Sequence, residues 1–181
     1  LTADEARAVV RAADVTGPRA AAVIRLILQV GCGVRDVTAA RVEDLADHAT
    51  ASSRPPRRTL AVTRRDGIRR LVLPTGVVRA VDRATGGRAE GPIVMTRDGR
   101  RVADSQVFRT VGLTGHTAGL ELTPRTLRDA CANLAIEAGV PLREVQCLLG
   151  HTHPNAPTCS GPATPHACAN VPGAIAALLG L

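Results

Sequence analysis

The sequence predicts a mainly α-helical domain with a small antiparallel β-sheet. Helices are indicated because apolar residues recur at intervals of three and four, in runs that begin or end at Pro or Gly. The sheet is indicated by two short β-branched or apolar runs, residues 59–63 and 70–73, with the turn-forming pair Asp66 and Gly67 between them. With 181 residues, 45% of them hydrophobic, the chain can bury the core of one domain.

The first two helices have recognisable start signals. Thr2 and Glu5 match a capping box, ahead of a helix that should end near Ala13. Pro18 opens a second helix, rich in Ala, Ile and Leu, which should run to Gln29. Since apolar residues lie on most sides of this second helix, we expect it in the core.

After the hairpin, the pattern predicts a helix over residues 75–83 and another over 102–111. The short apolar run 93–95 is expected to add a strand to the sheet. Residues 112–121 contain several Gly and polar residues and are expected to form a loop that places His116 at the surface.

Two more helices and a Gly-His turn are predicted within residues 122–151. Thr123 can cap the first of them, with Pro124 in its first turn, where a missing N–H is tolerated. Pro141 starts the second helix and Gly150 ends it. Because His151 follows this end directly, the fold can bring it close to Arg128 near the start of the first helix.

This stretch resembles the C-terminal half of the catalytic domain of the tyrosine recombinases, also called phage integrases. In that family a His-x-x-Arg helix start is followed by Leu-Gly-His and, nine residues after this His, by the Tyr nucleophile. Arg128 matches the Arg, and Leu149 to His151 match the Leu-Gly-His. Arg125 stands in the place of the first His, and Ser160 stands in the place of the Tyr.

The resemblance implies the fold of a DNA breaking-rejoining enzyme and double-stranded DNA as the partner. In the family, the Tyr hydroxyl attacks a DNA phosphate, two arginines stabilise the charge that develops, and Lys and His groups move protons. No metal or other cofactor takes part. Arg128 and His151 are therefore the candidate catalytic residues that match the family, whereas Arg125 and Ser160 are departures from it.

The first phosphate-binding arginine of the family has two candidate positions. An ungapped alignment backwards from residues 41–45 places Gly33 there, and Asp36 then matches a family Glu. Arg35 would fit only if two residues were deleted before Arg41. We prefer the ungapped alignment; Arg35 is expected near the site in either case, unless it is simply a solvated arginine at a helix start.

The hairpin carries four arginines, and the resemblance gives one of them a special position. Arg65 is the nearest match to a family Lys that serves as general acid, but an arginine is a poor proton donor because its pKa lies above about 12. We therefore expect a hairpin that binds DNA phosphates; the alternative is a solvated charged hairpin. The four are Arg64, Arg65, Arg69 and Arg70.

Composition favours a polyanionic partner. The 23 basic residues are all arginine, the net charge is +7 and the pI is near 10.7, which together point to nucleic acid. A membrane surface is the weaker alternative, because no basic amphipathic helix stands out and no apolar run reaches spanning length. We therefore expect no membrane partner.

Cysteine usage predicts a reducing, cytoplasmic location. The count of five is odd, no CxxC occurs, and no signal peptide opens the sequence. Zinc-ligand residue types gather near the C-terminus, but their spacing matches no finger or knuckle, so no metal site is expected. These residues are His151, His153, Cys159, His166 and Cys168.

The resemblance covers nearly the whole chain. The opening residues 1–10 look like the first helix of an integrase catalytic domain, so we expect residues 1–181 to form one such domain without the N-terminal core-binding domain. Residues 171–181 look like the terminal helix of the family, which often packs on a neighbouring subunit. Self-association through this helix is the corresponding expectation.

The predicted function is a DNA-binding integrase-like domain for site-specific recombination that is catalytically impaired, a pseudoenzyme. The reason is chemical: the chain contains no Tyr, and a serine hydroxyl at Ser160 is less acidic and shorter in reach than a phenol. Three alternatives stay open: a serine-based reaction, a DNA-binding module that has lost the reaction, and the remnant of a decayed integrase.

Overall fold

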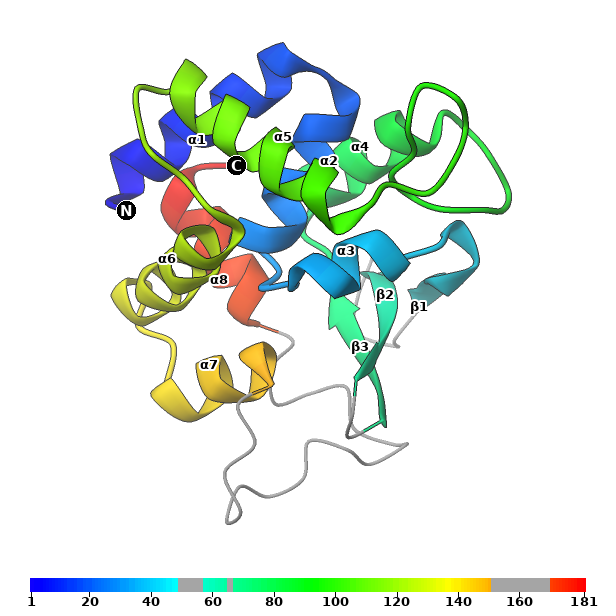
Figure 1. Cartoon of the computed structure of the whole chain (residues 1–181). Helices are drawn as coiled ribbons and strands as arrows, with labels where there is room; N and C mark the ends of the chain where they lie inside the picture. Colours follow the sequence, from blue (N-terminus) through cyan, green and yellow to red (C-terminus); the bar gives the residue numbers. More distant parts are fainter. Residues whose placement is uncertain (49–56, 65–66, 151–169) are drawn as a thin grey trace.

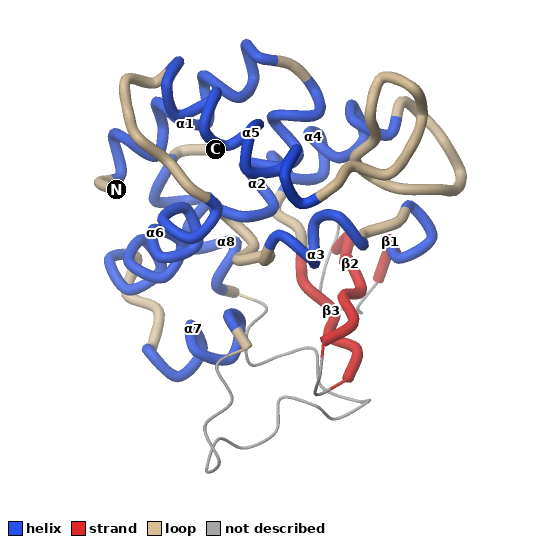
Figure 2. Tube along the Cα trace, in the orientation of Figure 1, coloured by secondary structure: helices blue, strands red, loops and turns tan. Residues whose placement is uncertain are grey.

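The structure is a computed structural model of the whole chain, and it describes residues 1–48, 57–64, 67–150 and 170–181. It is mainly helical with a three-stranded antiparallel sheet, so the predicted fold class is confirmed (Figures 1 and 2). The elements in chain order are α1 (Ala3–Thr16), α2 (Pro18–Leu28), α3 (Val34–Ala39), the 3₁₀ helix η1 (Val42–Asp44), β1 (Leu45–His48), β2 (Arg57–Arg64), β3 (Gly67–Val72), α4 (Thr75–Thr85), α5 (Asp104–Thr117), α6 (Pro124–Glu137), α7 (Leu142–Leu149) and α8 (Val171–Leu179).

Helix α2 is the centre of the helical body. Every residue from Ala20 to Leu28 is buried, as its apolar composition predicts. The helix packs against α1, α4, α5 and α6. The sheet lies to one side of this body, next to α3 (Figure 1).

The sheet has the order β1-β2-β3, with Leu60 of β2 paired to Leu45 on one side and Leu71 on the other. The predicted strand at 93–95 is wrong, because this segment forms only an isolated bridge between Met95 and Arg101. Pro92, which precedes it, has no N–H to extend a ladder. The third strand is β1, in the polar stretch Leu45–His48, which has no β-branched residue.

Helix α5 is longer than its sequence indicates. It continues through residues 112–117, so the predicted loop there is wrong, although His116 is exposed as expected. Gly115 is a packing residue and not a helix breaker: a Cβ there would lie 2.7 Å from the carbonyl oxygen of Leu120. The chain that follows the helix can therefore return closely along it.

Helix α8 packs within its own chain. It lies against α6, α1 and α7, and its buried residues include Ile175 and Leu179. Arg7 of α1 donates hydrogen bonds to the carbonyls of Leu178 and Leu179, at 3.0 and 3.2 Å. The apolar face of this helix is thus covered in the monomer, and self-association through it stays a prediction.

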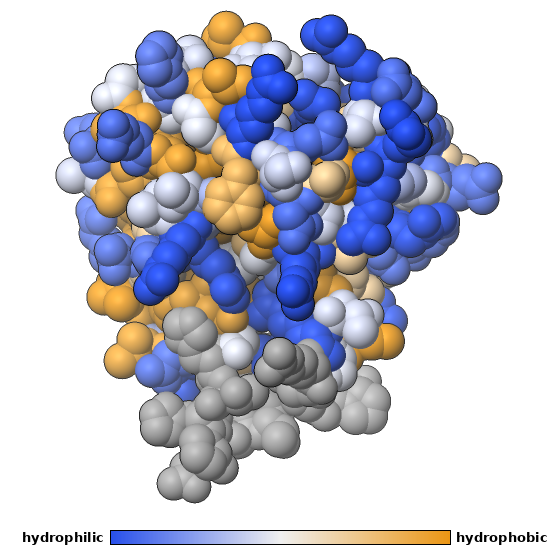
Figure 3. Space-filling model, in the orientation of Figure 1, coloured by the Kyte–Doolittle hydropathy of each residue, from blue (hydrophilic) through white to orange (hydrophobic). Residues whose placement is uncertain are grey.

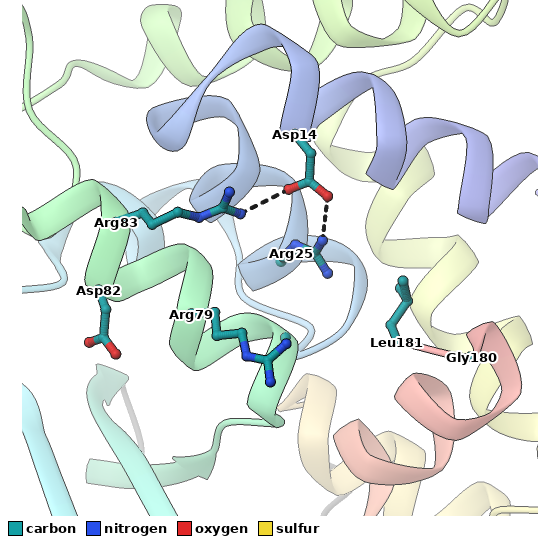
Figure 4. Close-up of a pocket in the computed structure, with 8 residues that line it drawn as sticks. Asp14, Arg25, Arg79, Asp82, Arg83, Gly180 and Leu181 are labelled. Carbon is teal, nitrogen blue, oxygen red and sulfur yellow. Dashed lines mark hydrogen bonds and ion pairs between the residues drawn. The ribbon is translucent and has the colours of Figure 1, made fainter.

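A buried arginine joins α1, α2 and α4. Arg25 is only 6% exposed, and its Nη2 lies 2.7 Å from Oδ2 of Asp14. The other oxygen of Asp14 accepts from Arg83 at 3.2 Å, so one carboxylate serves two guanidinium groups (Figure 4). Asp14 is therefore the counter-ion of a charge that is largely removed from water.

Replacing Asp14 with Ala should destabilise the fold by about 1.5–3 kcal/mol, because the bond to a buried charged group is lost. The measurement is the free energy of unfolding in urea. The matched control is Asp98→Ala, since Asp98 pairs with Arg100 at the solvent-exposed surface, where both side chains are more than 70% exposed. That pair should contribute less than about 1 kcal/mol. Equal losses for the two variants would contradict the structural role of Asp14.

Candidate functional site

Three arginines from different elements converge on the C-terminal end of α7. They come from β2, β3 and α6, and each donates to one of the last three carbonyls of the helix. The last carbonyls of a helix carry the negative end of its dipole, so cations are favoured there; the carbonyl of Cys147 also accepts from the backbone N–H of Gly150. The bonds are Arg69 Nη1 to Cys147 O at 2.5 Å, Arg64 Nη1 to Leu148 O at 3.0 Å, and Arg128 Nη2 to Leu149 O.

The β-strand period explains why two of these side chains come from the hairpin. Arg64 lies two residues after the buried Val62, and Val62 is paired with Arg69 across the hairpin. All three side chains therefore share the face that is turned towards the helical body. Arg70 lies on the opposite face and is exposed.

Gly150 meets two requirements at the end of α7. Its φ of +71° is left-handed, which favours glycine at a helix C-terminus. A Cβ at this position would also lie 2.6 Å from Nη1 of Arg64. The glycine of the Leu-Gly-His stretch therefore permits both the left-handed backbone and the close approach of the Arg64 guanidinium.

Asp36 connects this cluster to the N-terminal half of the chain. Its Oδ2 accepts from the backbone N–H of Gly33 at 2.8 Å and from Nη2 of Arg64, also at 2.8 Å. Both charged side chains are only 12% exposed. The carboxylate therefore fixes the start of α3 and at the same time holds Arg64 in place.

Arg128 lies on the other side of Gly33. Its Nε donates to the carbonyl of Gly31 at 3.2 Å. A Cβ added at Gly33 would lie 4.0 Å from Nη1 of Arg128 and 3.6 Å from Oδ2 of Asp36. The backbone at Gly33 therefore lies directly beside the guanidinium of Arg128.

Two buried thiols lie behind this cluster. Burial raises the pKa of Cys131 to about 12, and burial, with a smaller effect of Asp36, raises the pKa of Cys32 further. Both thiols are therefore protonated at ordinary pH and are core groups, not nucleophiles. Within the described ranges, no group of three or more His, Cys, Asp or Glu side chains could hold a metal ion.

A comparison with protein families gives a decisive match. A sequence model of the phage integrase family matches residues 1–156 of the 181. The chain belongs to the phage integrase family. Among curated relatives, the integrase-family chain is 28% identical over 176 residues to the tyrosine recombinase XerD of Bifidobacterium longum (strain NCC 2705). It is 35% identical over 99 residues to the tyrosine recombinase XerC of Pelobacter propionicus (strain DSM 2379 / NBRC 103807 / OttBd1).

These alignments cover 83% and 51% of this integrase-family chain, but only 54% and 33% of the two relatives. The chain thus spans about half the length of the XerD relative and about a third of the length of the XerC relative. Both matches agree with the family model.

Solved structures show the same fold. The XerA recombinase matches with a TM-score of 0.70 at 20% identity, over 84% of this chain and 56% of that one. The lambda integrase catalytic core matches with a TM-score of 0.61 at 21% identity, over 84% of this chain and 94% of that one. A lambda integrase dimer bound to a COC′ core site matches with a TM-score of 0.62 at 19% identity, over 91% and 61% of the two chains.

The structure brings together some of the residues predicted for the integrase site and leaves others apart. Arg128 lies at the centre, with Gly33 beside it. Arg125 does not join them: its side chain is 91% exposed and lies 3.9 Å from Asp129, one helical turn away. Arg35 is exposed at the start of α3. Arg65, His151 and Ser160 lie outside the described residues.

Sequence reasoning missed the inward direction of Arg64 and the central place of Asp36. Both had a usable signal. The spacing of Asp36 three residues after Gly33 is that of an N-terminal cap. The alternation of buried Leu60 and Val62 places Arg64 on the inner face of the integrase hairpin.

The surface beside the site is hydrophilic. Figure 3 shows strongly hydrophilic side chains over α3 and the segment between α4 and α5, whereas apolar atoms are more frequent over α1 and α6. Among the described residues, no helix is both long and apolar enough to cross a membrane.

Proposed function

We propose that this integrase-family chain is a DNA-binding domain for site-specific recombination that holds duplex DNA without cleaving it. The observation that carries the proposal is the cluster of Arg64, Arg69 and Arg128 around the end of α7. These side chains are held in place by backbone carbonyls, so they are ordered before any ligand arrives. Preorganised guanidinium groups are suited to phosphate oxygens.

Duplex DNA is supported as the ligand by charge and by similarity. The net charge of +7 favours a polyanion. Several structural neighbours are lambda integrases whose structures contain DNA, including the dimer bound to a COC′ core site. DNA binding by this chain is the simplest function that agrees with both.

Impaired cleavage is supported by the residues at the positions that perform the reaction in the family. The nucleophile position is Ser160, the proton-donor position is Arg65, and in the preferred ungapped alignment the position of the first phosphate-binding arginine is Gly33. Loss of one charge-stabilising donor costs about 10²- to 10³-fold in rate, and loss of a nucleophile costs about 10⁶-fold. The combined effect would remove measurable cleavage.

The hairpin arginines provide a quantitative test of DNA binding. If Arg64, Arg65, Arg69 and Arg70 each bind a phosphate, replacing any one with Gln should weaken binding similarly for all duplex sequences. The slope of log K, where K is the association constant, against log salt concentration should become shallower by about 0.9 for each arginine–phosphate pair that is removed. Fluorescence anisotropy with a labelled duplex over a range of KCl concentrations gives this slope.

Arg11→Gln is the matched control, because it removes the same charge from the exposed side of α1, far from β2 and β3 in Figure 1. Its slope should equal that of the wild type. A wild-type protein that does not bind duplex DNA at low salt would refute the proposed function. Unchanged slopes in the hairpin variants would leave these arginines as ordinary surface charge.

A further inference from the structure

We infer that Arg64 supplies the guanidinium that position 33 lacks, and that it forms with Arg128 a two-arginine site for one DNA phosphate. The inference rests on the proposed function, and it assigns to Arg64 a place inside the site and not on the outer surface of the hairpin. Arg64 would thus compensate for Gly33 from a different element of the fold.

The shared contact with Asp36 carries the first step. A side chain at position 33 would begin 3.6 Å from Oδ2 of Asp36 and 4.0 Å from Nη1 of Arg128. Arg64 reaches the same oxygen from β2, with its Nη2 at 2.8 Å. Its guanidinium is therefore bonded to the same carboxylate that a side chain at position 33 would approach.

Two glycines leave space around this guanidinium. Gly33 adds no side chain between Arg128 and Asp36, and a Cβ at Gly150 would lie only 2.6 Å from Nη1 of Arg64. An arginine at position 33 would add a third guanidinium beside those of Arg64 and Arg128, of which Arg64 is already paired with the carboxylate of Asp36. An arginine at position 33 and the inward Arg64 are therefore alternative ways to place a second cation beside Arg128.

The hydrogen-bond inventory leaves donors for a ligand. A guanidinium has five N–H groups. Arg64 uses its Nη1 and Nη2 on Leu148 and Asp36, and Arg128 uses its Nε and Nη2 on Gly31 and Leu149. Within the described part of the chain, Nη1 of Arg128 has no hydrogen-bond partner, and it is the atom that faces Gly33.

The charges also fit a phosphodiester. Two guanidinium groups and one carboxylate leave a net charge of one positive unit, opposite to that of one DNA phosphate. Asp36 holds Arg64 without neutralising the pair. A site with this charge would bind a single phosphate group without a metal ion.

The test is a rescue experiment with duplex DNA. Arg64→Gln should lower the salt slope of log K by about 0.9 and weaken binding. Adding Gly33→Arg to Arg64→Gln should restore the slope, because the new side chain reaches Asp36 and Arg128 from the other side. In the wild-type background, Gly33→Arg should change the salt slope by less than about 0.9, since Asp36 is already paired with Arg64.

Arg69→Gln is the matched control, because Arg69 also donates to a carbonyl at the end of α7, that of Cys147, but does so from β3 and not from β2. Gly33→Arg should not rescue it. Equal rescue of both variants would show a general gain of charge and overturn the inference. An unchanged slope in folded Arg64→Gln would overturn it as well and leave Arg64 as a structural contact of α7.

If Arg64→Gln fails to fold, Arg64→Lys replaces it. A lysine keeps the charge beside Asp36 but cannot bond Leu148, Asp36 and a phosphate at once, so binding should weaken several-fold with the salt slope retained. Unchanged affinity in this variant would overturn the inference.

A second measurement separates this inference from the proposed function. Orthophosphate should raise the thermal midpoint of the wild type more than those of Arg64→Gln and Arg128→Gln, because it binds the folded state. If the wild type does not bind DNA, the proposed function fails while this comparison still decides the role of Arg64. Equal shifts in all three proteins would overturn the two-arginine site.

Discussion

The wild-type protein and its Ser160→Tyr variant should both bind duplex DNA and form no covalent protein–DNA adduct. Tyr in place of Ser160 restores a phenol but not the groups that act with it. Arg65 would still stand where a proton donor is needed, and its guanidinium gives up a proton too rarely near neutral pH. Arg128 can stabilise developing charge but cannot begin the attack on phosphorus.

A suicide duplex with a nick near the cleavage position provides the assay, read as a shifted band on a denaturing gel without added metal. Combining Ser160→Tyr with Gly33→Arg and Arg65→Lys gives the best chance of an adduct. Its matched control is the same combination with Phe at position 160. An adduct with the wild type that disappears in Ser160→Ala would mean that cleavage uses serine and that the proposal of an inactive domain is wrong.

Gly115→Ala should be the most destabilising single-methyl substitution in α5, with a loss of about 3 kcal/mol from overpacking. The added Cβ would lie 2.7 Å from the Leu120 carbonyl oxygen and 2.9 Å from the side chain of Leu122. The Leu120 oxygen is a backbone atom and cannot rotate away as a side chain can, so the backbone between α5 and α6 must shift.

Gly112→Ala is the control for this prediction, because Gly112 lies one turn earlier in the same helix and an added Cβ meets nothing within 4 Å. Here alanine should stabilise the protein by about 0.5–1 kcal/mol through its higher helix propensity. Urea unfolding of both variants gives the comparison. A neutral Gly115→Ala would show that the close approach of residues 118–122 is not needed.

The fold was predictable where local signals act alone. The caps at Thr2 and Thr123 lie where the sequence places them, and each accepts the expected backbone hydrogen bond. The errors came from tertiary contacts. Gly115 resembles a helix breaker until the neighbouring chain is known, and β1 pairs with β2 in spite of its polar composition because an edge strand needs only one neighbour.

The site was predictable in part for a similar reason. The position of Arg128 next to the end of α7 follows from two helices with clear start and stop signals. The direction of Arg64 depends on the register of the hairpin, and the exposure of Arg125 depends on how α6 is rotated in the core. Periodicity specifies which residues share a face, but packing decides what that face contacts.

The arginines at the end of α7 also affect the order in which the protein assembles. Arg64 and Arg69 are 84 and 78 residues from the carbonyls that they bind, and Arg128 is 97 residues from Gly31. Such distant contacts form only after long stretches of chain have been closed into loops. An eight-residue helix is too short to persist alone in water. We therefore expect the arginine cluster at the end of α7 to be completed late in folding, and local opening of the native protein to begin there.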